Sequence, residues 1–67
     1  MDFGKKLENE LKTQKITPYE LAKKTKIKKQ SIYNYINGIQ EPSISKLYKI
    51  CIALDVSADY LLGLKEY

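Results

Sequence analysis

A row of uncharged hydrogen-bonding side chains lies in the middle of the chain. Gln30, Tyr33, Asn34 and Asn37 are offset by zero, three, four and seven residues, so they share one face of a helix that turns about 100° per residue. Asn and Gln accept from the amino group and donate to the ring nitrogen of adenine in the major groove of DNA. Solvated helix faces usually carry Lys and Glu instead, because Asn has poor helix propensity. The row therefore indicates a surface that reads base edges; the alternative is incidental polar surface.

Lysines gather just before this row. Residues 12 to 29 hold seven of the twelve basic groups and a single acid, Glu20, in a chain with a formal net charge of +4. Such a stretch suits phosphate groups or an anionic membrane surface, although lysine runs also occur as plain solvated faces. All the basic residues are Lys, which orients an anion less firmly than the planar fork of Arg does. The lysines thus predict attraction to a polyanion, and the uncharged row predicts discrimination.

Residue types that carry catalysis or bind metals are scarce. The chain has one cysteine, Cys51, and no histidine, which excludes an intramolecular disulfide and a conventional zinc site. Cys51 lies between Ile50 and Ile52 in a helical pattern, and we interpret it as a small core residue rather than a reactive thiol. No nucleophile stands beside a base, so we expect no enzymatic activity, no catalytic residue, no metal and no cofactor.

The length of 67 residues predicts one domain, residues 1–67, with a core near the lower limit for independent folding. A chain this short leaves little room for a ligand cleft, and we expect no small-molecule ligand. The longest apolar run, Ile50 to Leu54, is far shorter than the roughly 20 residues of a membrane span, and no signal segment opens the chain. We therefore expect a cytoplasmic protein without a membrane partner.

Apolar spacing and capping residues predict the first two helices. Phe3, Leu7 and Leu11 recur at four-residue steps and predict an amphipathic helix from about Asp2 to Thr13, with Asp2 as a candidate cap. The run Thr17-Pro18-Tyr19-Glu20 combines a capping hydroxyl, a proline at the first helical position and a glutamate three residues after the cap. It predicts a second helix, from Pro18 to about Thr25.

Three further helices follow from the same signals, so the predicted fold is all-α with no strand. A helix over Lys29 to Asn37 places an apolar set on one side, and Asn37-Gly38 ends it: Ile32, Tyr35, Ile36 and Ile39. Ser43 caps a fourth helix that is apolar over a wide arc and is therefore expected at the centre of the core: Ile44, Leu47, Tyr48, Ile50, Cys51 and Leu54. Ser57 caps a fifth helix through Leu62, stopped by Gly63.

Short pieces along nearly the whole chain follow one known pattern. They are Ile16-Thr17, Glu20 to Thr25, Ile27, Ser31-Ile32, Asn37-Gly38, Glu41 to Ser43, and Leu54 to Gly63. In this order and spacing they resemble the helix-turn-helix domains of the lambda repressor and Cro type, also named after the xenobiotic-response-element repressor. The resemblance implies a compact five-helix domain whose second and third helices form the helix-turn-helix. It also implies that the third is the recognition helix and that a homodimer binds a double-stranded DNA operator.

The resemblance further implies which side chains touch DNA. Carried across by position, the base-contacting residues overlap the uncharged row: Lys28, Lys29, Gln30, Tyr33 and Asn34. Phosphate contacts are expected from the start of the second helix, the turn and the loop after the third helix: Thr17, Tyr19, Lys26, Asn37 and Gln40. Helix ends and the loops beside them point N–H groups at phosphate, so these positions make physical sense.

Three positions depart from the family pattern. Pro18 and Tyr19 stand where a phosphate-binding Gln is common, so that contact is expected to be lost or moved to Tyr19. Lys26 stands where the turn commonly has Gly, and a left-handed backbone there would cost Lys about 1 kcal/mol. Ile36 replaces a common Glu at the end of the recognition helix and extends its apolar face. Each departure weakens a literal transfer of contacts, and none abolishes DNA binding.

The C-terminal residues are a candidate dimer surface, with residues 64–67 as a dimerisation tail. They are more apolar than a free terminus of a small monomer should be: Tyr60, Leu61, Leu64 and Tyr67. In the alternative interpretation, Leu61 and Leu62 simply close the core.

The leading hypothesis is a sequence-specific transcriptional regulator, most plausibly a repressor that binds a palindromic operator as a homodimer. It leaves open a Cro-like phage regulator, an immunity repressor of a mobile element and a restriction-modification control protein. The alternative is a protein-interaction module with the same fold, such as an antitoxin or anti-repressor; few acids in residues 12 to 29 argue against it. RNA binding is less favoured, because RNA-binding modules usually display more stacking aromatics than Tyr33 alone.

Overall fold

The computed structural model describes residues 2–66, which contain five helices and no strand. The helices are α1 (Phe3–Gln14), α2 (Pro18–Thr25), α3 (Lys29–Ile36), α4 (Ile44–Leu54) and α5 (Ala58–Leu61). The predicted all-α, five-helix fold is confirmed, and each predicted helix boundary lies within one residue of the observed one.

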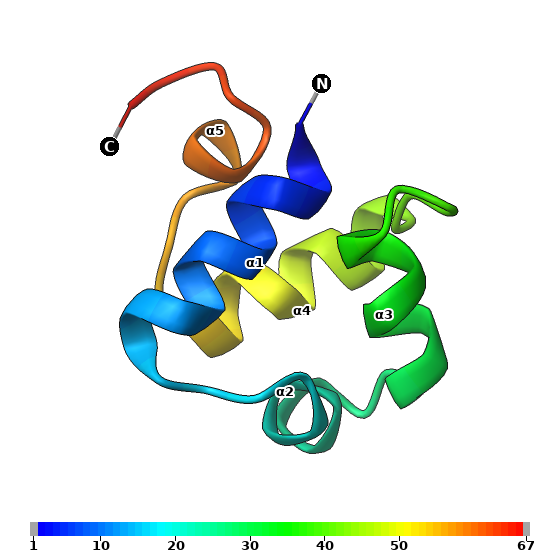
Figure 1. The fold of residues 1–67 in the computed structure, drawn as a ribbon. Coiled ribbons are helices and arrows are strands. Elements are labelled where there is room, and N and C mark those ends of the chain that lie inside the picture. The colour runs from blue at the N-terminus through cyan, green and yellow to red at the C-terminus, as the bar shows by residue number, and fades with distance from the viewer. Residues whose placement is uncertain (1, 67) are drawn as a thin grey trace.

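The helices pack around a single core (Figure 1). In that view α1 crosses in front of α4, with α2 below, α3 to the right and α5 at the upper left. Helix α3 packs against both α1 and α2, while α4 packs against α2 and α5. Residues 26–28 join α2 to α3 as a short turn. All five helices and this turn contribute buried apolar side chains: Phe3, Leu7, Leu11, Leu21, Ala22, Ile27, Ile32, Tyr35, Ile50, Leu54 and Leu61.

Helix α1 approaches the end of α3 at Gly4. A Cβ atom on this glycine would lie 2.6 Å from the main-chain oxygen of Ile36, too close for any side chain. The absence of a side chain at Gly4 therefore lets α1 rest against the α3 backbone. At the start of α1, Asp2 occupies the N-cap position, but its side chain makes no capping hydrogen bond.

Helix α2 begins at the predicted capping box. The Thr17 hydroxyl oxygen accepts a hydrogen bond from the Glu20 N–H at 3.1 Å, and the Glu20 carboxylate accepts one from the Thr17 N–H at 2.9 Å. The hydrogen bonds from the Thr17 backbone N–H and then from its side chain, together with the nearby charge of Lys24, hold the pKa of Glu20 below its ordinary value. Because the box satisfies two main-chain groups, it fixes where α2 begins.

The turn between α2 and α3 is held by Thr25. Its buried hydroxyl donates to the Leu21 carbonyl oxygen at 2.8 Å and accepts from the Ile27 N–H at 3.3 Å. Lys26, between them, has φ 59° and ψ 26°, which is the left-handed conformation that favours glycine. Lys26 therefore incurs the expected cost of about 1 kcal/mol for a left-handed backbone at a residue other than glycine.

Two predictions of burial are wrong. Ile39 is 72% exposed, because α3 ends at Ile36 and Gly38, with φ +74°, turns the chain away from the helical path. On α4 only Ile50 and Leu54 are fully buried. The outer face of α4 lies open, with Ile44 88%, Tyr48 66% and Ile52 65% exposed. Cys51 is half-buried against the core, and burial raises the pKa of its thiol.

Candidate nucleic-acid interface

The uncharged row lies on the outward side of α3, where one hydrogen bond joins two of its members and a second connects the row to the following loop. The Gln30 side-chain amide donates to Asn34 Oδ1 at 3.0 Å, and Asn34 Nδ2 donates to Gln40 Oε1 at 3.0 Å. Gln30 and Tyr33 are exposed and Asn34 is half-buried. The opposite side of α3 buries Ile32 and Tyr35, as the helical spacing predicts. Helix α3 therefore separates its packing side from a side rich in donors and acceptors.

The start of α3 is positively charged and has no side-chain cap. Lys28 occupies the N-cap position, and its side chain offers no acceptor to the first-turn N–H groups. Lys29 follows as the first residue of the helix, and both lysines are exposed. Helix N-termini carry partial positive charge, so this end of α3 is suited to meet phosphate or base acceptors.

Tyr19 brings the lysines of α2 and α3 to one corner of the molecule. Its ring is 56% exposed, and the Nζ atoms of Lys23 and Lys29 lie 5.4 Å and 6.0 Å from the ring centroid. The Tyr19 ring thus lies in a positive field beside the start of α3. This position fits the expectation that Tyr19 takes over a phosphate contact.

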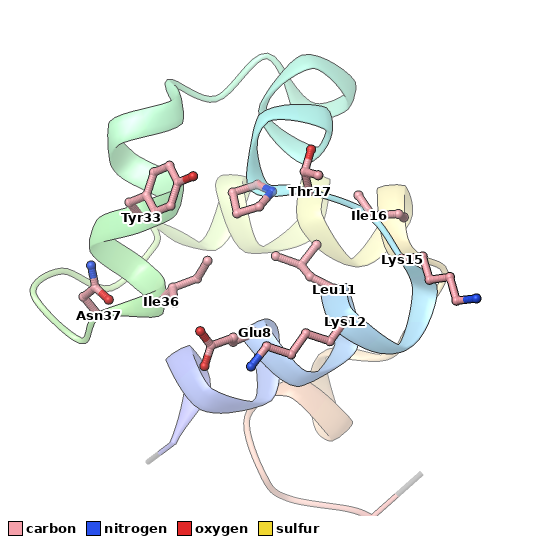
Figure 2. Close-up of a pocket in the computed structure, with 10 residues that line it drawn as sticks. Glu8, Leu11, Lys12, Lys15, Ile16, Thr17, Tyr33, Ile36 and Asn37 are labelled. Atoms are coloured by element: carbon pink, nitrogen blue, oxygen red, sulfur yellow. The ribbon is translucent and has the colours of Figure 1, made fainter.

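A hollow of about 480 Å³ lies between α1, the start of α2 and α3. Figure 2 shows Tyr33 and Asn37 on the α3 side, Thr17 across from them, and Leu11 and Ile36 pointing inward. The structure therefore gathers three predicted contact residues, Thr17, Tyr33 and Asn37, around one depression. The Thr17 hydroxyl oxygen accepts a hydrogen bond from the Glu20 N–H within the capping box.

Two cations that the sequence analysis did not assign also line this hollow. Lys12 and Lys15 come from the end of α1; Figure 2 shows Lys12 beside Glu8, the one acid among the lining residues, across the hollow from Thr17. The charge count over residues 12 to 29 included both lysines, but only the packing of α1 beside α3 shows that they border the predicted contact residues. Lys12 and Lys15 are therefore additional candidates for phosphate contacts.

Lys26 lies apart from this hollow. It lines a different depression of about 490 Å³, together with Lys24, Tyr48 and Lys49 from the α2–α4 side. Gln40, also expected to contact phosphate, is instead hydrogen-bonded to Asn34 through its carbonyl oxygen. The predicted phosphate set is thus divided among four places rather than one.

The candidate dimer residues that the structure describes differ in exposure. Leu61 is fully buried in the core of the single chain, so it is removed from the predicted dimer surface. Tyr60 is half-buried, with Lys6 Nζ 5.1 Å from its ring centroid. Leu64 is 71% exposed, and Tyr67 lies outside the described residues.

We name the exposed side chains of Ile44, Tyr48 and Ile52 the α4 strip; they form an apolar row at four-residue intervals.

Comparisons with known proteins agree with the observed order of helices. The model of a family described as helix-turn-helix matches residues 7–61, from within α1 to the end of α5. Neither the curated proteins nor the solved structures gave a match. Between residues 2 and 66, no helix combines the length and the apolar content needed to cross a membrane. The same residues contain no cluster of three or more metal-ligating side chains.

Proposed function

The chain belongs to the lambda repressor/Cro type of helix-turn-helix proteins, which are DNA-binding transcription regulators, and on this premise we propose that it is a repressor that binds a palindromic operator as a homodimer. The single observation that carries the proposal is the outward side of α3. Gln30, Tyr33 and Asn34 face away from the core there, beside the exposed lysines that begin the helix. A cytoplasmic location fits this function.

The binding energy divides between two groups of residues. Lysines near phosphate supply attraction that falls with salt, by about 0.9 log units of affinity per log unit of salt for each phosphate neutralised. The amides of α3 supply discrimination of about 1–3 kcal/mol for each well-formed base contact. The lysines thus hold the domain on DNA, and Gln30, Tyr33 and Asn34 select the sequence.

A homodimer follows from the small reach of one recognition helix. One helix reads only a few base pairs, whereas two-fold dimers read two half-sites about 34 Å apart on one side of the duplex. The Cα atoms of this domain extend 27 × 23 × 20 Å, so two copies side by side match that spacing once side chains are added. The proposed dimerisation tail is residues 64–67; within it, the main-chain N–H groups of Leu64 and Lys65 donate to the Asp59 carbonyl oxygen of α5.

The experiment that tests the proposal is selection of bound sequences from random duplex DNA. We expect an enriched palindrome with half-sites about one helical turn apart. The absence of enrichment, even at low salt, would contradict the proposal.

The exposed α4 strip keeps a second candidate function open. Exposed apolar side chains in a row often mark protein contacts, and a module that binds another regulator would use such a surface. A protein of this kind, such as an antitoxin or anti-repressor, would show no sequence preference in the same selection.

A further inference from the structure

The polar row of α3 continues beyond the helix into the loop through Gln40. We propose that Gln40 is a positioning residue that holds the side-chain amide of Asn34 in place for base recognition; this inference rests on the proposed function. Its basis is a continuous chain of hydrogen bonds in which Gln30 donates to Asn34 and Asn34 donates to Gln40, each at 3.0 Å. From the sequence alone, Gln40 is expected to contact phosphate only.

The main chain holds Gln40 beside Asn34. The Asn34 carbonyl oxygen accepts hydrogen bonds from the Ile39 N–H at 2.9 Å and the Gln40 N–H at 3.3 Å. Gly38, with φ +74°, provides the turn that brings residues 39 and 40 back to the helix end. Gln40 is therefore attached to Asn34 through both main chain and side chain, so the loop is anchored to the recognition helix.

The two side-chain bonds hold the Asn34 amide between Gln30 and Gln40. With Gln30 and Gln40 oriented as observed, rotating the Asn34 amide alone by half a turn would place its NH₂ group against the donating group of Gln30 and its oxygen against the Gln40 oxygen, and both bonds would be lost. In the observed orientation, Asn34 keeps one free N–H and one free lone pair. An adenine edge requires one donor and one acceptor, so Asn34 is held with both groups available before DNA binds.

Gln40 still has groups free for a second contact. Its carbonyl oxygen holds Asn34, while both N–H groups of its amide remain available to donate to a phosphate. Positioning and phosphate contact are therefore compatible, and they predict different effects of substitution. Loss of a phosphate contact weakens binding to every sequence alike, whereas loss of positioning lowers the preference for the selected site.

The test measures affinities for the selected site and for a random duplex with three variants of Gln40 and Asn34. Gln40→Met keeps the length of the side chain and removes the acceptor, and we expect it to lower the ratio of the two affinities about three- to tenfold. In an Asn34→Ala background, the same substitution should change the ratio less than about twofold.

Gln40→Glu keeps an acceptor, so it should retain the ratio while weakening binding to both DNAs. Ile39→Ala, in the same exposed loop, is the matched control and should leave the ratio unchanged.

A measurement without DNA tests the hydrogen bond itself. In NMR spectra of the free protein, Gln40→Met should shift the Asn34 side-chain NH₂ signals and speed their exchange with water, whereas Gln40→Glu and Ile39→Ala should not speed it. Unchanged Asn34 signals in Gln40→Met would overturn the inference. A wild-type preference that survives Gln40→Met would also overturn it and leave the proposed function standing. A wild type without sequence preference would overturn both.

Discussion

The uncharged side chains of α3 are expected to supply the preference for one DNA sequence. We expect Gln30→Ala and Asn34→Ala to reduce the preference for the selected site by about 1–3 kcal/mol each, because each removes a group suited to a base edge. Titrations of each variant with the selected duplex and with a random duplex measure this preference. An equal loss on both DNAs for Gln30→Ala would show that the base-reading side is assigned wrongly.

Two lysines in different depressions test where the DNA backbone lies. Lys12 borders the hollow shared by Thr17 and Asn37, whereas Lys26 lies on the α2–α4 side. We expect Lys12→Ala and Lys26→Ala each to weaken specific and random DNA alike and to reduce the salt slope by about 0.9. Affinities measured at several salt concentrations give the slope. A slope that changes only for Lys12→Ala would remove Lys26 from the phosphate contacts.

Tyr35 carries a polar atom that its surroundings do not satisfy. Its side chain is 1% exposed, and its hydroxyl has no hydrogen-bond partner among the described residues. Its ring stands edge-on to Phe3, with centroids 6.4 Å apart. We expect Tyr35→Phe to keep this packing and raise the free energy of unfolding by about 1 kcal/mol, because a buried unpaired hydroxyl is destabilising. A lower urea midpoint for Tyr35→Phe would show that the hydroxyl is satisfied in solution.

At the scale of the elements, the close packing of α1 against α3 depends on Gly4. We expect Gly4→Ala to lower the free energy of unfolding by about 1–3 kcal/mol, although Ala is the better helix former, since the new Cβ meets main-chain atoms of α3. Urea denaturation measures the change. Lys5→Ala, at an exposed position of the same helix, should have little effect. If both variants were equally stable, the close approach at Gly4 would be refuted.

The capping box of α2 predicts a dependence on pH. The pKa of Glu20 is lowered in the folded protein, so the stability it contributes is present above its ordinary value of 4.5 and is lost as pH falls through the folded value. Glu20→Gln keeps an acceptor for the Thr17 N–H and does not titrate. We expect the stability of wild type to fall toward that of Glu20→Gln between about pH 5 and pH 3, as followed by thermal unfolding. Parallel curves for the two proteins would contradict this.

Local sequence signals were sufficient to place the helices. They were not sufficient to predict which helix faces the rest of the chain covers. The capping box of Thr17 and Glu20 placed the start of α2 correctly, because it acts within four consecutive residues. The helical wheel failed at Ile39, because the wheel assumed a helix that Gly38 had already ended. The spacing of α4 showed an apolar arc, yet nothing local indicates that the arc is covered only in part. The Gln30–Asn34–Gln40 chain likewise depends on a loop whose path no spacing rule predicts.

The whole molecule offers two surfaces for association. We expect the wild type to sediment as a dimer and removal of residues 64–67 to weaken it, because Leu64 is exposed and apolar. Tyr48→Lys places a charge at the centre of the α4 strip and tests the other surface. If the tail deletion leaves the mass unchanged and Tyr48→Lys yields a monomer, the interface lies on α4. Circular dichroism of both variants verifies that they remain folded.

The division of α3 into two sides has a consequence for how such a protein changes over time. Residues 30, 33 and 34 face away from the core, while Ile32 and Tyr35 and the contact at Gly4 keep the helix in place. We therefore expect mutations on the outer side to leave the scaffold intact and to alter the preferred DNA. We expect a library randomised at these three positions to yield folded proteins with new operators, which is how a compact domain diversifies.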